Sequence, residues 1–297
     1  MVSPQAKIVR RMLRGTSGKK GYDRSRITIQ RQRFERNMAL LFPTRSAVKE
    51  SRIADVPVAW IRQTKTTQRT IMYLHGGGFT FGSPKSHLQH MARLAKMCNA
   101  TVLAVDYDLA PENPYPTALE QIQKVWEMLI QDKTFNVKKV VIAGDSAGGG
   151  LALASVMRFR DANLPQPACV ILLSPALDAT FSGKSYSSND SKDVLLNSDK
   201  LEFFAAAYAQ LQSRYIPFIS PVYADLKGLP PLLIHVGSDE MVLSDSETVA
   251  KHAKRAGVPV TLFVGEGMWH GWHFFASYVP EAKAAMRAVA EYVLSHT

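Results

Sequence analysis

Residues 139–159 read KVVIAGDSAGGGLALASVMRF and place a serine between an apolar strand and a helix. The run KVVIA is typical of a strand buried on both faces, and GGLALASVMRF is typical of a helix. Gly144 and Gly148, two residues before and two after Ser146, let the backbone turn sharply without a Cβ clash. The stretch therefore predicts that Ser146 Oγ is exposed beside a helix N-terminus, at the carboxyl end of a buried strand.

The chain beyond residue 50 repeats this alternation of apolar strands and helical segments. Further strands are predicted over residues 70–75, 101–107, 169–174, 231–236 and 260–264. Continuous apolar runs between helices predict a mostly parallel sheet with helices on both faces, and residues 51–63 fit an antiparallel hairpin at one edge. Residues 181–220 interrupt the pattern with a polar loop and an aromatic-rich helix, so we expect an insertion over the sheet.

Length and composition indicate a globular protein of 297 residues, 46% of them hydrophobic, which is enough for one large α/β domain or two smaller ones. Cys98 and Cys169 lie far apart and outside any CxxC pattern, which argues against a disulfide framework or a zinc site. The basic N-terminus has no apolar signal region, and the longest apolar run is too short to span a bilayer. We therefore expect a soluble, cytoplasmic protein without stable membrane insertion, provided that no signal peptide has been removed.

The net charge of +11 is concentrated near the N-terminus, where residues 1–70 contain 17 Lys and Arg against 4 Asp and Glu. Such a segment could bind nucleic acid or an anionic membrane. However, Phe34, Met38 and Leu41 recur at helical spacing between the arginines, as in a helix that lies on an apolar surface. We interpret the basic residues as the solvated face of a packed helix and expect no nucleic-acid partner.

A serine nucleophile needs amide donors for an oxyanion, and the sequence YLHGGGF at residues 73–79 can supply them. Consecutive glycines let backbone N–H groups face a cavity, and the residue after the nucleophile completes the set. Gly77, Gly78 and Ala147 are the predicted donors. His75 is interpreted as a residue that holds the loop by hydrogen bonds to the backbone.

Five motifs together give the chain a recognisable family pattern. They are HGGGF (75–79), DYDLAPENPYP (106–116), GDSAGG (144–149), LSPALD (173–178) and PLLIHVGSDEMVLSD (231–245). In this order they resemble the hormone-sensitive-lipase-like esterases, bacterial family IV, of the α/β-hydrolase superfamily.

The resemblance implies the α/β-hydrolase fold, with an eight-stranded, mostly parallel sheet and a helical cap. Residues 1–48 would form the N-terminal part of the cap, and residues 49–297 the catalytic domain with the cap insertion at about 181–220. It also implies hydrolysis of short- to medium-chain acyl esters without a cofactor or metal, and it allows a homodimer. One position departs from the pattern: the family usually has arginine where this chain has Asp108.

The superfamily order of nucleophile, acid and base points to residues 231–245 for the acid. Asp239, Glu240 and Asp245 all compete there. Asp239 is nearest to the strand end and matches the position that the family uses, so it is the predicted acid, with Glu240 as the alternative. Asp245 is interpreted as a cap of the following helix.

His270 is the predicted base because it follows the last strand by six residues and fits the family's EGxxH pattern. His273 is the alternative, since it fits a looser HxF pattern, but a helix is expected to begin there. His87 and His90 could ligate a metal in principle. No carboxylate accompanies them at ligand spacing, so we interpret them as a surface pair.

Aromatic residues near these motifs are candidates for the acyl and alcohol pockets of a small-molecule ester. They are Phe79, Phe81, Tyr208, Tyr215 and Trp269. Two other functions stay open from the residues alone: an amidase or peptidase with the same triad, and a noncatalytic small-ligand receptor on the same scaffold, although retention of a nucleophile, an acid and a base argues against the receptor.

Overall fold

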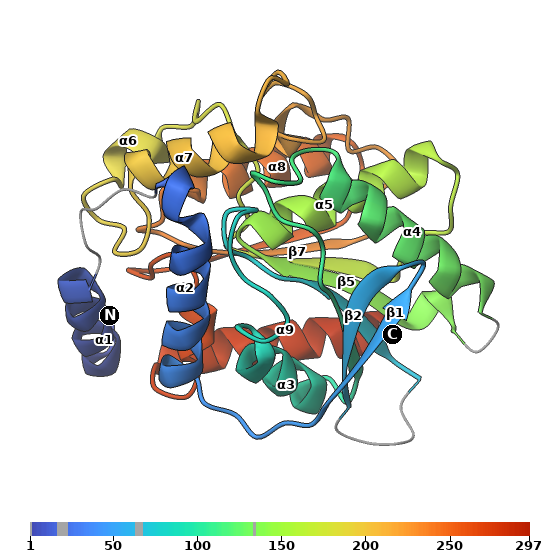
Figure 1. Ribbon diagram of the computed structural model, residues 1–297, viewed down its shortest axis with the longest axis horizontal. Helices are drawn as coiled ribbons and strands as arrows, with labels where there is room; N and C mark the ends of the chain where they lie inside the picture. The colour runs from blue at the N-terminus through green and yellow to red at the C-terminus, as the bar shows by residue number, and fades with distance from the viewer. Residues whose placement is uncertain (1, 17–22, 63–67, 133–134) are drawn as a thin grey trace.

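The fold is built on one eight-stranded sheet (Figure 1). The structure is a computed structural model, which describes residues 2–16, 23–62, 68–132 and 135–297. The strand order is β1-β2-β4-β3-β5-β6-β7-β8. Strands β3 to β8 pair in parallel, and β1, β2 and β4 pair antiparallel. The strands are β1 (Val48–Ile53), β2 (Val56–Arg62), β3 (Thr70–Leu74), β4 (Thr101–Val105), β5 (Val140–Asp145), β6 (Cys169–Leu173), β7 (Leu232–Gly237) and β8 (Val260–Gly265). The predicted fold class is confirmed.

Helices cover both faces of this sheet, as the apolar strand patterns require. Helices α4, α5 and α8 lie on one face, and α3 and α9 lie on the other (Figure 1). The long helices are α1 (Pro4–Thr16), α2 (Ile27–Leu41), α3 (Leu88–Met97), α4 (Thr117–Gln131), α5 (Ala147–Asp161), α7 (Ser198–Ala209), α8 (Leu243–Arg255) and α9 (Pro280–His296). The shorter ones are η1 (Arg24–Arg26), η2 (Val137–Lys139), α6 (Ser185–Ser188), η3 (Pro221–Tyr223) and η4 (Trp272–Phe275).

The central strands contribute to two apolar cores because their side chains alternate between the faces. In β3, Met72 and Leu74 pack with α4 and α5, whereas Ile71 and Tyr73 pack with α3 and α9. Every residue of β3 is buried. This explains why the strand reads as a continuous apolar run, without the polar alternation of a half-exposed strand.

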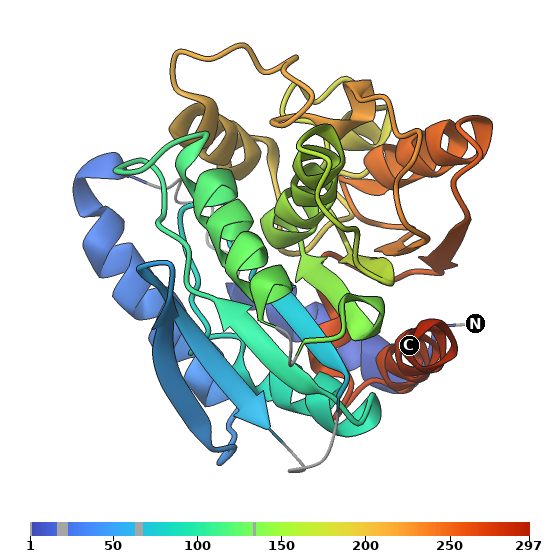
Figure 2. The same cartoon turned by 90° about the vertical axis from the view of Figure 1, so that its right-hand side faces the viewer.

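The expected antiparallel hairpin is present at one edge, formed by β1 and β2 (Figure 2). Strand β2 pairs with β4, so the hairpin extends the sheet beyond its parallel part. The side chains of β1 are largely exposed, whereas β2 is largely buried. This difference fits an edge strand beside a strand that has neighbours on both sides.

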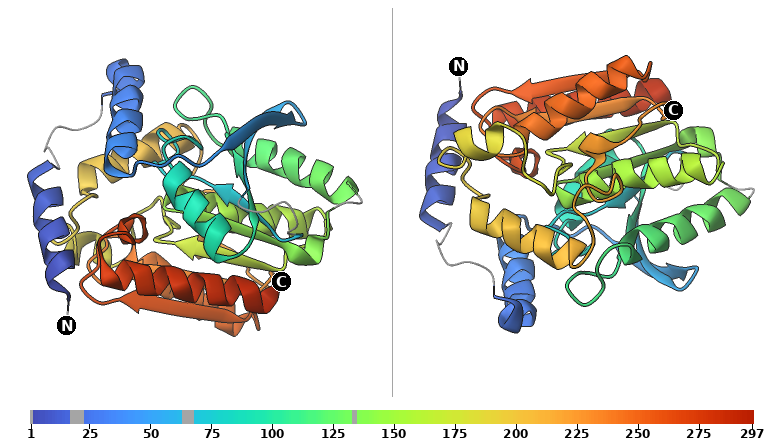
Figure 3. Two further views of the ribbon diagram at one scale, coloured as in Figure 1. Left: turned by 90° about the horizontal axis from the view of Figure 1, so that it is seen from below. Right: turned by 90° about the horizontal axis from the view of Figure 1, so that it is seen from above.

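The two N-terminal helices, α1 and α2, lie toward the same side of the molecule (Figure 3). Phe34 of α2 faces inward, with its ring centroid 6.0 Å from that of Phe81, and Met38 packs against the core. Leu41 is instead 49% exposed, so the predicted apolar stripe is partly buried at two of its three positions. No helix in the described part of the chain is long and apolar enough to cross a membrane.

Candidate active site

The turn at Ser146 has the sharp geometry that its glycines predict. Strand β5 ends at Asp145 and α5 begins at Ala147, leaving Ser146 at φ 52°. A Cβ on Gly144 would lie 2.2 Å from Gly148 O, and one on Gly148 would lie 2.1 Å from Leu74 O. Only glycine fits at these two positions, so the motif is required by the close approach of three backbone segments.

His270 is the histidine that contacts this serine, with Nε2 2.8 Å from Ser146 Oγ. It follows β8 in a loop and is 7% exposed. His273 instead packs in the interior, with its ring centroid 4.3 Å from that of Trp272 and 5.7 Å from that of His235. Neither ring nitrogen of His273 has a hydrogen-bond partner among the described residues. Burial lowers the pKa of His273 well below its ordinary value, which keeps it neutral.

The carboxylate that contacts His270 belongs to Glu240, so the prediction that Asp239 contacts this histidine is wrong. Glu240 Oε2 lies 2.9 Å from His270 Nδ1. Asp239 points away and forms an ion pair with Arg10 of α1. The reason is a tight turn after β7, closed by a hydrogen bond of 3.2 Å from Glu240 N to Gly237 O, which brings Glu240 back over the strand end.

Glu240 is completely buried and receives three hydrogen bonds. Besides His270, the Ser174 hydroxyl donates to Oε1 at 2.7 Å, and Gly237 N donates to the same oxygen at 2.6 Å. Burial alone would lower the pKa of His270, but the hydrogen bond and negative charge of Glu240 outweigh it, so this pKa is raised above 6.5. The site therefore favours a positive charge on the imidazole.

The glycine loop after β3 presents amide groups beside Ser146. Gly77 has φ 120° and Gly78 has φ 62°, a region that side chains disfavour. A Cβ on Gly78 would also lie 2.3 Å from the Phe204 ring. In the described part of the chain, the N–H groups of Gly77, Gly78 and Ala147 donate to no protein acceptor. They are therefore available to an oxygen of a bound molecule.

Asp145 joins this loop to the nucleophile strand. Its buried carboxylate accepts hydrogen bonds from Gly76 N at 3.0 Å and from the Tyr73 hydroxyl at 2.7 Å, and it lies 3.5 Å from His87 Nε2. Burial would raise the pKa of Asp145, but its interaction with His87 and the hydrogen bond from Tyr73 outweigh this effect and lower the pKa. His75 Nδ1 lies 2.9 Å from Gly76 O, as expected for a residue that holds the loop.

Three side chains take other places than the sequence predicts. His87 and His90 are 2% and 1% exposed, so they are a buried pair and not a surface pair. Asp245 does not cap α8, which begins at Leu243. Its carboxylate accepts hydrogen bonds from the amides of the loop after β6 and from the hydroxyl of Tyr186. At Asp108, the carboxylate pairs with the side-chain amide of Gln121 at 2.9 Å.

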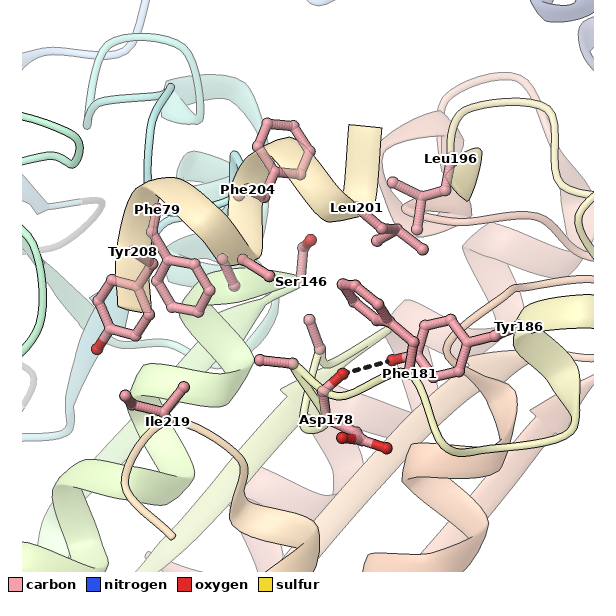
Figure 4. A pocket seen from close by; sticks show the side chains of 15 residues that line it. Phe79, Ser146, Asp178, Phe181, Tyr186, Leu196, Leu201, Phe204, Tyr208 and Ile219 are labelled. Atoms are coloured by element: carbon pink, nitrogen blue, oxygen red, sulfur yellow. Dashed lines mark hydrogen bonds between the residues drawn. The ribbon is translucent and has the colours of Figure 1, made fainter. Parts of the chain in front are cut away.

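A cavity of about 50 Å³ opens above Ser146 and has mostly apolar walls (Figure 4). Phe79 and Tyr208 form one wall, with their rings stacked 3.8 Å apart at 8°. The other large side chains that line it are Phe181, Tyr186, Leu196, Leu201, Phe204 and Ile219. Leu201, Phe204 and Tyr208 come from α7, so this aromatic-rich helix forms one side of the cavity.

The remaining aromatic candidates do not line this cavity. Phe81 is 2% exposed and packs between Phe34 and Phe204, whereas Trp269 is fully buried against Phe275. Tyr215 is 65% exposed. The structure therefore does not place these three side chains at this cavity. Sequence proximity to a motif does not reveal on which side of the loop a ring lies.

Comparisons with known proteins show the family and the fold. A family model described as the α/β hydrolase fold matches residues 71–274. An acetyl-hydrolase of Streptomyces hygroscopicus is 36% identical over 80% of this chain and 79% of its own. A hormone-sensitive lipase from a metagenome library is 34% identical in sequence, with a TM-score of 0.94 over 100% of this chain and 99% of that one. An esterase soaked with p-nitrophenyl butyrate is 33% identical, with a TM-score of 0.92 over 99% of both chains.

Proposed function

Because the chain belongs to the α/β-hydrolase family, as a carboxylic ester hydrolase of the hormone-sensitive-lipase type, we propose that it cleaves short acyl esters with Ser146, His270 and Glu240. The observation that carries this proposal is the chain of contacts from Ser146 Oγ through His270 to Glu240 at the floor of an apolar cavity. Glu240 takes the part that the sequence assigned to Asp239.

In the first half of the reaction, His270 Nε2 accepts the Ser146 proton while Oγ attacks the ester carbonyl carbon. Negative charge develops on the carbonyl oxygen, and the amides of Gly77, Gly78 and Ala147 donate to it. Glu240 stabilises the imidazolium. His270 then protonates the departing alkoxide, and the acyl group remains on Oγ.

In the second half, water replaces the alcohol beside His270. The imidazole removes a proton from this water as its oxygen attacks the acyl carbon, and the same amides bind the second oxyanion. Collapse of this intermediate breaks the bond to Ser146 Oγ, which regains its proton from His270. The carboxylic acid leaves and the free enzyme is restored.

The cavity supports an acyl group of limited length. The space above Ser146 is small, at about 50 Å³, and its walls are mostly apolar. We therefore propose best turnover near butyrate or hexanoate, with activity falling beyond about ten carbons. In this proposal α1 and α2, within residues 1–48, and the insertion at about 181–220 act together as the cap.

The test is a series of p-nitrophenyl esters from acetate to laurate, with a butyryl anilide as the matched amide. We expect the short esters to turn over fastest, the anilide to turn over far more slowly, and Ser146→Ala to be inactive on all of them. Faster hydrolysis of long-chain emulsions than of butyrate would contradict the acyl-length proposal. A comparable rate on the anilide would indicate an amidase.

A further inference from the structure

Arg31 of α2 is bound at the back of the glycine loop, away from the reacting serine. Its Nε donates to Thr80 O at 2.8 Å and its Nη2 donates to Ala110 O at 2.8 Å. The guanidinium also binds Glu112 through both terminal nitrogens, at 2.9 and 2.7 Å. One side chain from the N-terminal segment thus holds two loops together.

The contact with Thr80 leads to the oxyanion site through two peptide groups. Phe81 N, which shares a planar peptide with Thr80 O, donates to Gly77 O at 2.9 Å. Gly77 O in turn shares a peptide with Gly78 N, and in a trans peptide the N–H points opposite to the C=O. Because Phe81 fixes the direction of Gly77 O, it also fixes the direction of the Gly78 N–H.

All the dipoles in this series point the same way, from the guanidinium toward the cavity. A cation at the start of such a chain polarises each following N–H, and hydrogen bonds in series strengthen one another. Gly78 lines the cavity together with Ser146, where negative charge develops in the reaction. The positive charge of Arg31 is therefore relayed toward the oxyanion without contact with the substrate.

We propose that Arg31 is a positioning residue for the oxyanion hole, which orients and polarises the Gly78 N–H through the Thr80–Phe81 and Gly77–Gly78 peptides. This inference rests on the proposed ester hydrolysis. It assigns α2 a part in transition-state stabilisation, in addition to covering the site.

The test compares Arg31→Met with Arg33→Met. Methionine retains an apolar stem but has no donor or charge, and Arg33 is an exposed arginine of the same helix. The kcat and KM for p-nitrophenyl butyrate are measured per active site, after titration with a covalent serine inhibitor. The Ki of a butyl trifluoromethyl ketone, which forms a tetrahedral oxyanion adduct with Ser146, is measured in parallel. Thermal melting reports on folding.

For Arg31→Met we expect kcat to fall about tenfold to a hundredfold, somewhat less than the loss of a whole oxyanion donor. KM should change by less than about threefold, whereas the ketone Ki should weaken in proportion to kcat/KM. Arg33→Met should match the unaltered protein. Arg31→Lys keeps a cation that can reach one carbonyl, so it should recover part of kcat.

A purely structural role would lower the melting temperature and the fraction of titratable sites while kcat per site and ketone affinity stay unchanged, and that result would overturn the proposal. Equal losses in Arg31→Met and Arg33→Met would also overturn it. If Arg31→Met does not fold, Arg31→Lys decides by the same ratio of Ki to KM. Absence of turnover in the unaltered protein would instead reject the proposed function itself.

Discussion

Replacing Glu240 with glutamine tests which of two adjacent carboxylates serves His270. Oε1 of Glu240 accepts two hydrogen bonds, from Ser174 and Gly237, so it must remain an acceptor. In Glu240→Gln the amide oxygen therefore takes this place, and the NH₂ group faces His270 Nδ1. A donor there pairs only with an unprotonated Nδ1, which puts the imidazole proton on Nε2, opposite Ser146.

An imidazole in that tautomer cannot accept the serine proton. The equivalent carboxylate-to-amide change in a serine protease triad lowers kcat by about 10⁴-fold, or about 5 kcal/mol of activation free energy. We expect a similar loss for Glu240→Gln in a folded protein. Asp239→Asn removes only a partly exposed ion pair with Arg10, so it should cost about 1 kcal/mol of stability or less and change kcat by less than about threefold.

The assay is p-nitrophenyl butyrate turnover per titrated site for both variants, with circular dichroism as the folding control. An inactive but folded Asp239→Asn beside an active Glu240→Gln would refute the reasoning. A pH profile adds a second readout, because the carboxylate holds the pKa of His270 up. The residual activity of Glu240→Gln should therefore persist to lower pH than that of the unaltered enzyme.

Three further predictions follow from the same contacts. His270→Ala should be folded yet lose about 10⁴-fold in turnover, whereas His273→Ala should retain activity with a modest drop in melting temperature; the reverse pattern would exchange their roles. Because Glu240 raises the pKa of His270 above 6.5, kcat/KM should fall as the pH drops through that raised value, and a flat profile between pH 5 and 8 would contradict this. Deleting residues 1–40 should impair turnover and promote aggregation by exposing apolar surface, and a soluble, fully active truncation would show that the segment is dispensable.

The fold and the sharp turn at Ser146 could be predicted from the sequence because their signals are local. A glycine is required wherever two backbone segments approach too closely for a Cβ, as at Gly144 and Gly148, and this leaves a readable pattern around Ser146. Parallel strands then bring their carboxyl ends to one edge, so the elements that carry the acid and the base could also be predicted.

The choice between Asp239 and Glu240 could not be made in this way. Both residues follow β7 within the same turn, and only the path of that turn decides which side chain enters the site. Counting from the strand end favours Asp239, but the bond between Glu240 N and Gly237 O reverses the chain. The role that we propose for Arg31 could not be predicted from the sequence either, because it depends on the orientation of two peptide groups and not on residue type.

The position of Thr297 has a practical consequence for attaching the enzyme to a support. Thr297 is hydrogen-bonded to Arg69, which directly precedes β3. Thr297 therefore lies at the amino-terminal ends of the parallel strands. Ser146 lies at the opposite, carboxyl ends of these strands. Immobilisation through Thr297 would therefore leave the mouth of the cavity facing the solution, whereas a linker on α1 would pull on Arg10 and on the turn that carries Glu240.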